Sequence, residues 1–114
     1  MSLILDLHTN RVKLVFPGDI LSTNVETLRA EIFSEFDSAA FLSAGYQEFD
    51  FDFRKAQMID SAGLNLIIAI LRQIKKKPTR VSALVSSAHV FHILLFTRLD
   101  RQMEIVMSED AVTV

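Results

Sequence analysis

The sequence predicts an α/β fold in which helices pack on a mixed, mostly parallel β-sheet. Three observations predict this class. Short runs that alternate hydrophobic and polar residues, as strands do, recur along the chain of 114 residues. Longer runs between them repeat hydrophobic residues at helical spacing. The resulting strand–helix–strand units require right-handed crossovers and parallel neighbouring strands, while two strands at the start form a hairpin. The predicted order is β-β-α-β-α-β-α-β.

The opening hairpin is predicted from two alternating runs. Hydrophobic residues occupy every second position in residues 3–7 and again in residues 12–16. The break between them, at residues 8–11, is short enough for a tight turn. Pro17 and Gly18 then close the second strand, because neither residue suits a strand interior.

A helix is expected to begin near Thr23. Thr23 and Glu26 have the spacing of a capping box, and hydrophobic residues follow at helical intervals. Two ends of this helix are compatible with the sequence. The helix either continues to Leu42, with Gly45 as a left-handed stop, or breaks after Asp37.

The middle of the chain gives the clearest strand and helix. Glu48–Phe53 alternates strictly, so its three phenylalanines share one face of a strand and its acidic residues the other. Residues 64–74 form a helix with an unusually wide hydrophobic surface, which implies deep burial. Its core stripe consists of Leu64, Ile67, Ile68, Leu71 and Ile74, widened by Leu66 and Ile70.

The remaining elements complete the sheet. Pro78 ends the preceding helix, and residues 81–85 form a strand. Ser86 and Ser87 offer caps for a third helix that extends to about Arg98, and residues 103–107 form the last strand.

Length and composition exclude several classes of protein. A chain of 114 residues, half of them hydrophobic, is expected to form one domain that spans residues 1–114. With no cysteine, disulfides, thiolate metal sites and thiol nucleophiles are excluded, and a cytoplasmic protein is expected. A net charge of -2 gives no long-range positive electrostatic field that would attract nucleic acid. The basic cluster of Lys75, Lys76 and Lys77 with Arg72 and Arg80 complements the negative end of a helix.

No membrane insertion is expected. The longest uncharged run, residues 82–97, is shorter than the roughly 20 apolar residues of a spanning helix. The first residues lack the basic and apolar regions of an export signal.

The segment Met58-Ile59-Asp60-Ser61-Ala62-Gly63-Leu64 is the main candidate site. It lies between the predicted strand 48–53 and the predicted helix 64–74, so Ser61 is expected at a helix N-terminus. Backbone N–H groups there have no intrahelical acceptor and favour negative charge, so Ser61 can carry a phosphate. Capping preference alone also explains Asp60 and Ser61 as an ordinary helix start.

This segment resembles the phosphorylation motif of the STAS domain of bacterial anti-sigma factor antagonists, in which the serine after the aspartate is the phosphoacceptor. The predicted element order resembles the STAS fold over residues 3–107, nearly the whole chain. The resemblance implies that the protein binds an anti-sigma factor that is itself an ATP-dependent serine kinase. Phosphate on Ser61 would then switch binding off, and a phosphatase would restore it.

Some positions differ from the family pattern. The family's Gly-x-Leu-Asp corresponds here to residues 18–21, so Leu21 occupies the place of the aspartate and Asp19 lies two positions earlier. Ala62 and Asn65 replace the second serine and second glycine of Ser-Ser-Gly-Leu-Gly. The alternative function is therefore a STAS subunit without a phosphate cycle, such as the STAS component of a lipid ABC transporter or a signalling scaffold.

The predicted partner-binding surface comprises the Ser61 edge, the first turns of the neighbouring helices and a hydrophobic pair on the third helix. Phe91 and Leu95 stand where the family commonly has charged residues. They form either an exposed patch or a contact under a neighbouring loop, against Phe41 or Leu42. The residues of this surface are Asp19, Ser22, Thr23, Asn24, Met58, Asp60, Ser61, Ala62, Asn65, Phe91 and Leu95.

No enzyme, cofactor or metal is predicted. His89 and His92 have helical spacing for two metal ligands, but the sequence offers no suitable third ligand nearby. The Gly-x-Ser-x-Gly elbow of serine hydrolases is absent, as are glycine-rich phosphate loops. Any ATP chemistry would therefore belong to a partner protein. The sequence does not predict the oligomeric state.

Overall fold

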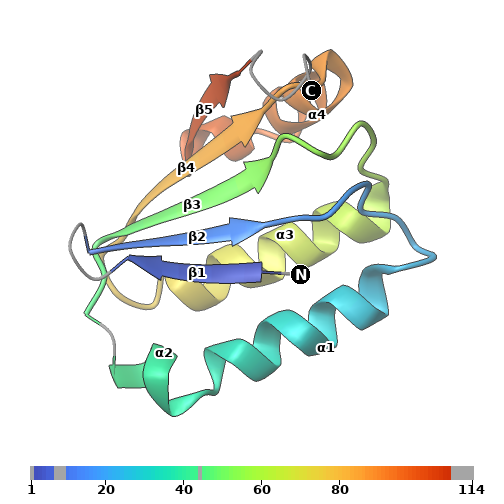
Figure 1. Cartoon of the computed structure of the whole chain (residues 1–114). Coiled ribbons are helices and arrows are strands. Elements are labelled where there is room, and N and C mark those ends of the chain that lie inside the picture. The colour runs from blue at the N-terminus through green and yellow to red at the C-terminus, as the bar shows by residue number, and fades with distance from the viewer. Residues whose placement is uncertain (1, 7–9, 44, 109–114) are drawn as a thin grey trace.

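The computed structural model describes residues 2–6, 10–43 and 45–108. Within these residues five strands form one sheet in the order β1-β2-β3-β4-β5. The first two strands pair antiparallel, and every other pair is parallel (Figure 1). The sheet is therefore mixed and mostly parallel, as predicted. The strands are β1 Ser2–Asp6, β2 Arg11–Val15, β3 Glu48–Phe53, β4 Arg80–Val85 and β5 Glu104–Met107.

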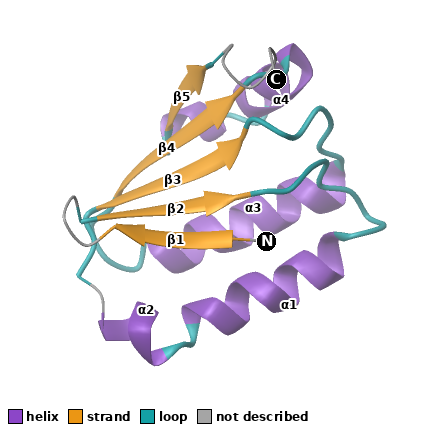
Figure 2. Cartoon of the chain, in the orientation of Figure 1, coloured by secondary structure: helices purple, strands orange, loops and turns teal. Residues whose placement is uncertain are grey.

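The helices connect the parallel strands. Helices α1 and α3 lie side by side along one face of the sheet (Figure 2). The predicted order of elements is confirmed, with a short helix α2 and a 3₁₀ turn η1 in addition. The helices are α1 Val25–Phe36, α2 Ala39–Ser43, α3 Ser61–Ile74, α4 Ala88–Phe96 and η1 Leu99–Arg101. None of the helices in the described ranges combines the length and apolar character needed to cross a membrane.

The core lies between the sheet and these helices. Phe49, Phe51 and Phe53 of β3 all point into it, as the alternation of that strand predicted. Phe16, just after β2, stacks on Phe53 with ring centroids 5.1 Å apart. In α3, Ile67, Leu71 and Ile74 of the predicted core stripe are buried, as are Leu66 and Ile70, which were predicted to widen it. The other two residues of the predicted stripe, Leu64 and Ile68, are only partly buried.

The opposite face of β3 carries two buried carboxylates. Asp50 and Asp52 are 5% and 4% exposed. Arg11 lies 2.9 Å from Asp50, and Arg54 binds both carboxylate oxygens of Asp52 at 3.0 and 2.8 Å. Burial opposes ionisation of Asp52, but the hydrogen bonds from Arg54 together hold its pKa below the usual value. Ion pairs with Arg11 of the neighbouring strand β2 and with Arg54 just after β3 thus allow acidic residues at buried positions.

Two details of the first helix differ from the sequence prediction. Helix α1 begins at Val25 with Asn24 as its N-cap, and this cap makes no side-chain hydrogen bond to the helix, so the capping box of Thr23 is wrong. The Asn24 side chain instead closes the preceding loop: its Oδ1 accepts from the Leu21 N–H at 2.9 Å, and its Nδ2 donates to the Asp19 carbonyl at 2.8 Å.

The break after Asp37 is the correct alternative for the end of this helix. The Ser38 hydroxyl donates to the Glu35 carbonyl at 2.7 Å and accepts from the Phe41 N–H at 3.2 Å, so it ends α1 and starts α2. Gly45 does not have a positive φ, and the left-handed stop is therefore wrong. The predicted turn of the opening hairpin falls largely on residues 7–9, outside the described residues.

Candidate functional site

Three loops meet at the carboxyl ends of the parallel strands β2, β3 and β4, where binding sites commonly form in α/β sheets (Figure 1). We call residues 17–24, 54–60 and 86–87, with the first turn of the helix that follows each loop, the three-loop edge. Backbone contacts extend the sheet between the first two loops. Ile20 and Ile59 form an isolated parallel bridge, and the Asp60 N–H donates to the Ile20 carbonyl at 3.2 Å.

Gly63 permits this close approach. A Cβ atom at Gly63 would lie 2.3 Å from the Ile20 carbonyl oxygen and 2.9 Å from Cγ2 of Ile59. Real Cβ atoms essentially never approach other atoms so closely, so only glycine fits without movement of the loops. The first turn of α3 is thereby held directly against the bridge between the two loops.

Two carboxylates join the loops further. Asp19, in the first loop, accepts hydrogen bonds from the N–H groups of Gln57 and Met58 at 2.8 and 3.2 Å. Asp60, in the second loop, accepts from the Ser22 N–H at 2.7 Å. Each loop thus supplies a carboxylate to the backbone of the other, which fixes their relative position.

Asp60 is also the N-cap of α3. Its Oδ1 accepts from the Gly63 N–H at 2.9 Å, and its carbonyl accepts from the Leu64 N–H. The hydrogen bond from Gly63, followed by that from Ser22, lowers the pKa of Asp60 below its ordinary value. Asp60 is therefore ionised at neutral pH and supplies a fixed negative charge at the helix start.

Ser61 is the first residue of α3 and is exposed. Because the capping role belongs to Asp60, no hydrogen bond among the described residues occupies the Ser61 hydroxyl. This hydroxyl lies at the positive end of the helix dipole and next to an ionised carboxylate. The geometry leaves the hydroxyl accessible to a protein that approaches the three-loop edge.

The other predicted residues of the first two loops lie around Ser61. Met58 is 49% exposed and places a hydrophobic side chain on this surface. Ser22 and Thr23 are exposed before α1, Ala62 is half-buried and Asn65 is exposed one turn along α3. The Asp19 carboxylate binds the backbone of the second loop rather than Ser61.

The third loop connects this surface to α4. Ser87 is the N-cap of α4, as predicted, and its hydroxyl also donates to the Gln57 carbonyl at 3.2 Å. On α4, Phe91 is half-buried against the core and Leu95 is 37% exposed. Phe41 packs against Phe36 and Tyr46 and therefore does not cover Phe91 and Leu95.

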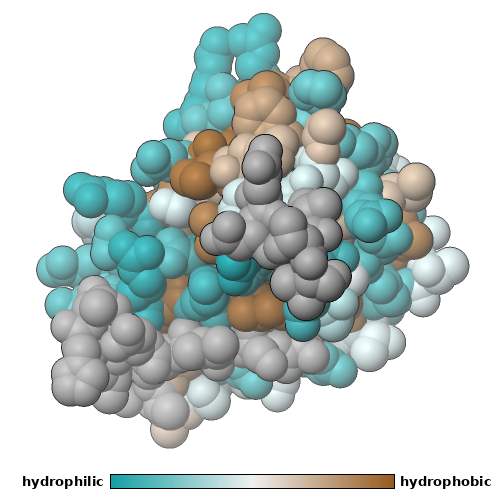
Figure 3. All heavy atoms as spheres, turned by 45° about the horizontal axis from the view of Figure 1, so that its top comes forward, coloured by the Kyte–Doolittle hydropathy of each residue, from teal (hydrophilic) through white to brown (hydrophobic). Residues whose placement is uncertain are grey.

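The face in Figure 3 is mainly hydrophilic, with small separate hydrophobic areas. The exposed large hydrophobic residues are Leu42, Met58, Leu95, Phe96, Val106 and Met107.

Sequence reasoning missed Gln57, whose backbone contacts both Asp19 and Ser87. No sequence signal identifies it, because these contacts depend on the backbone path of the loop and not on its side chain. No group of three or more histidine or acidic side chains within the described ranges is arranged to hold a metal ion.

No protein-family model and no curated protein matches the sequence. Solved structures do match. A candidate anti-sigma factor antagonist of Thermotoga maritima superposes with a TM-score of 0.74 and 21% identity over 98% of this chain and 90% of that one. The anti-sigma factor antagonist SpoIIAA, in its unphosphorylated form, gives 0.65 and 22% identity over 97% and 93%. This is the STAS fold.

The same fold occurs in a different class of protein. A sulfate transporter family protein of Wolinella succinogenes has a TM-score of 0.67 and 11% identity over 91% of this chain and 83% of that one. The superpositions show that this chain shares the STAS fold with these proteins, and at these identities they show no more than the fold.

Proposed function

We propose that this protein is a bacterial anti-sigma factor antagonist. In this proposal its three-loop edge binds, in the cytoplasm, an anti-sigma factor that is also a serine kinase. Binding releases the sigma factor, phosphorylation of Ser61 ends the interaction, and a phosphatase restores it. The fold that the chain shares with SpoIIAA, a Bacillus protein with both unphosphorylated and phosphorylated structures, supports this proposal.

The observation that carries the proposal is the exposed hydroxyl of Ser61 beside the ionised carboxylate of Asp60. A phosphate would add about -1.5 to -2 charges at this point. Both Asp60 oxygens are already occupied by the N–H groups of Gly63 and Ser22, so the carboxylate keeps its position and charge when the phosphate is added. The switch is therefore a concentrated negative charge on a surface that is otherwise held rigid.

A concentrated charge of this kind weakens an interface with an acidic or apolar partner surface. The exposed hydrophobic side chain of Met58 on this edge favours an apolar partner contact. Desolvating a phosphate against such a contact is costly, and like charges across an interface repel. Phosphorylation is therefore expected to lower affinity without unfolding the domain.

The test begins with affinity recovery of the natural partner, followed by incubation of the purified pair with ATP. The proposal predicts phosphate on Ser61, detected by mass spectrometry of peptides, and no modification of a Ser61→Ala variant. Ser61→Asp should lose the partner, whereas Ser34→Asp, at an exposed serine on α1, should retain it. An active kinase that modifies a control antagonist but leaves Ser61 unmodified would refute the phosphate cycle.

A second function is favoured by one observation. Leu21 occupies the position of the family's aspartate, and the Asp19 carboxylate is used by the backbone of Gln57 and Met58. The alternative is a STAS subunit that docks a protein through the same edge without a phosphate cycle, such as the STAS component of a lipid ABC transporter or a signalling scaffold. The shared fold with a sulfate transporter family protein is consistent with this use.

The two functions differ in the partner recovered. A serine kinase that modifies Ser61 supports the antagonist, while a transporter ATPase subunit that binds without modifying Ser61 supports the alternative. Under both functions Ser61→Ala keeps the complex and Ser61→Asp disrupts it, so these variants test the interface and the kinase reaction tests the cycle.

A further inference from the structure

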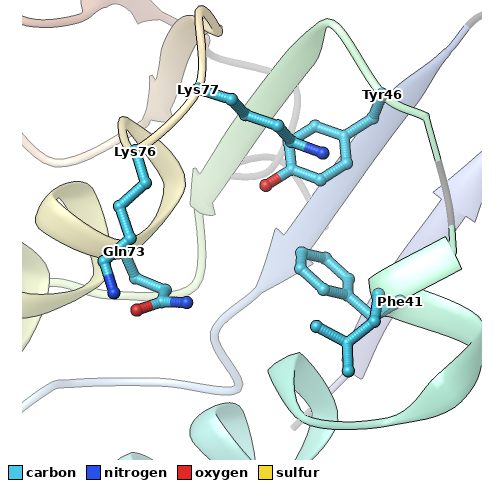
Figure 4. A pocket seen from close by; sticks show the side chains of 6 residues that line it. Phe41, Tyr46, Gln73, Lys76 and Lys77 are labelled. Atoms are coloured by element: carbon cyan, nitrogen blue, oxygen red, sulfur yellow. The ribbon is translucent and has the colours of Figure 1, made fainter.

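A pocket lies at the end of α3 that is remote from Ser61. It is formed by α2, the segment before β3 and the last turn of α3, and it has a volume of about 180 Å³ (Figure 4). We call it the α2–α3 pocket. Since an α-helix rises about 1.5 Å per residue, the 12 positions from Ser61 to Gln73 separate the pocket from the three-loop edge by about 18 Å. The residues that line it are Phe41, Leu42, Tyr46, Gln73, Lys76 and Lys77.

Tyr46 is the most informative residue of this pocket. Its side chain is packed between Phe41 and Phe49, and the residue is only 5% exposed. Its hydroxyl points into the space between Phe41 and the side chains of α3 (Figure 4). Within the described part of the chain this hydroxyl has no hydrogen-bond partner. No side-chain nitrogen or oxygen of the described residues is both buried and unpartnered, so the hydroxyl oxygen is open to the pocket although most of the Tyr46 side chain is buried. The hydroxyl is therefore available to a ligand.

The hydroxyl of Tyr46 is a donor at neutral pH. Burial raises the pKa of Tyr46 above its ordinary value, so the group stays protonated. The Gln73 side-chain amide extends from α3 toward the same space (Figure 4). A ligand in the pocket therefore meets a hydroxyl donor and an amide that can also donate.

The lysines add positive charge. Lys77 places its Nζ 4.0 Å from the centroid of the Tyr46 ring, and Lys76 also lines the pocket. Neither lysine has a carboxylate partner among the described residues. The ammonium groups are thus available to an anion.

The wall opposite α3 is apolar. The Phe41 ring packs at 4.9 Å from Phe36 and 5.3 Å from Tyr46, measured between centroids, so its position is fixed. Leu42, on the rim, is 69% exposed. The pocket therefore combines an apolar wall with hydrogen-bond donors and positive charge, the combination that small-molecule sites use.

We propose that the α2–α3 pocket binds a small aromatic acid, with its ring against Phe41 and its anionic group held by Tyr46, Lys76 and Lys77. The size fits, because an engineered protein cavity of about 150 Å³ accommodates benzene. The anionic group then extends to the open rim, where the ammonium groups lie. This inference does not depend on the proposed function of the three-loop edge.

Binding can be tested by NMR titration of the full chain with benzoate and with phenyl phosphate, which carry the same ring on two kinds of anion. At least one is expected to bind with a Kd on the order of 1 mM, as suits about ten non-hydrogen atoms. Amide shifts should concentrate on residues 41–46 and 73–77. Benzyl alcohol, which lacks the charge, and acetate, which lacks the ring, should each bind at least about tenfold more weakly.

Three variants locate the site. Tyr46→Phe keeps the ring and removes the unpartnered hydroxyl, so the fold should persist while affinity falls about tenfold. Lys77→Gln should weaken binding similarly, whereas Lys75→Gln, at an exposed lysine that does not line the pocket, should leave it unchanged. The proposal is overturned if neither acid binds at 10 mM, if acetate binds as well as benzoate, or if Tyr46→Phe and Lys75→Gln have equal effects.

Discussion

Replacement of Gly63 by alanine tests how the three-loop edge is built. The added Cβ would lie 2.3 Å from the Ile20 carbonyl oxygen, a backbone atom that moves only if the first loop moves. Overpacking of this kind costs about 1–3 kcal/mol, and contact with backbone favours the upper end. Alanine is about 1 kcal/mol more favourable than glycine in a helix, which offsets part of this cost. The expected net loss is therefore about 2 kcal/mol in the free energy of unfolding.

The measurement is urea unfolding of the wild type and Gly63→Ala, supported by thermal scans. For a chain of 114 residues a loss of about 2 kcal/mol corresponds to a Tm lower by about 8 °C. Gly18→Ala is the matched control, since a Cβ there meets no atom within 4 Å and the φ of Gly18 is not positive. The control should be unchanged or slightly more stable. A Gly63→Ala protein as stable as the control would refute the close approach of α3 to Ile20.

Two further perturbations test the buried charges and the loops. Arg54→Met should lower the free energy of unfolding by about 1–3 kcal/mol at pH 7, because Asp52 loses both side-chain hydrogen bonds from this residue. The lowered pKa of Asp52 makes this contribution present above its unfolded pKa of about 3.9 and lost as the pH falls through the lower, folded value. Urea unfolding should therefore show a smaller difference between Arg54→Met and the wild type at pH 3 than at pH 7. Asp19→Ala should speed amide hydrogen exchange at Gln57 and Met58 about tenfold. Asp19→Asn keeps an acceptor oxygen and should have a smaller effect. Equal exchange rates in the two variants would contradict the hydrogen bonds from these N–H groups to the Asp19 carboxylate.

The strands and the two long helices could be predicted because their signals are local. Strict alternation in Glu48–Phe53 matches β3 residue for residue, and the wide hydrophobic surface of residues 64–74 includes the buried side of α3. The Ser87 cap of α4 also follows from neighbouring residues alone. In each case the residues that determine the structure lie within a few positions of one another.

The errors arose where one local signal competed with another. The Thr23 capping box is a valid pattern. The side chain of Asn24, however, accepts from the Leu21 N–H and donates to the Asp19 carbonyl, and Asn24 instead of Thr23 is the N-cap. Gly45 could have ended a long helix, yet the Ser38 hydroxyl ends α1 first. The sequence offers both choices, and only the folded chain shows which hydrogen bonds form.

The candidate site could be located from sequence but not assembled. Asp60 and Ser61 at the start of α3 follow from local pattern. The contact of Asp19 with Gln57 joins residues 38 positions apart and depends on the parallel register of β2 and β3, which no single sequence pattern fixes. For the same reason, the pocket around Tyr46 could not be predicted from the separate lysine cluster.

The most direct test of the Ser61 switch compares the affinity of the natural partner for the unmodified protein and for protein that carries phosphoserine at residue 61, installed during synthesis. Like-charge repulsion and desolvation at an interface cost several kcal/mol, so the phosphoprotein is expected to bind at least about a hundredfold more weakly. Its circular dichroism and Tm should stay close to those of the unmodified chain. Equal or tighter binding of the phosphoprotein would show that a phosphate on Ser61 does not switch the interaction off.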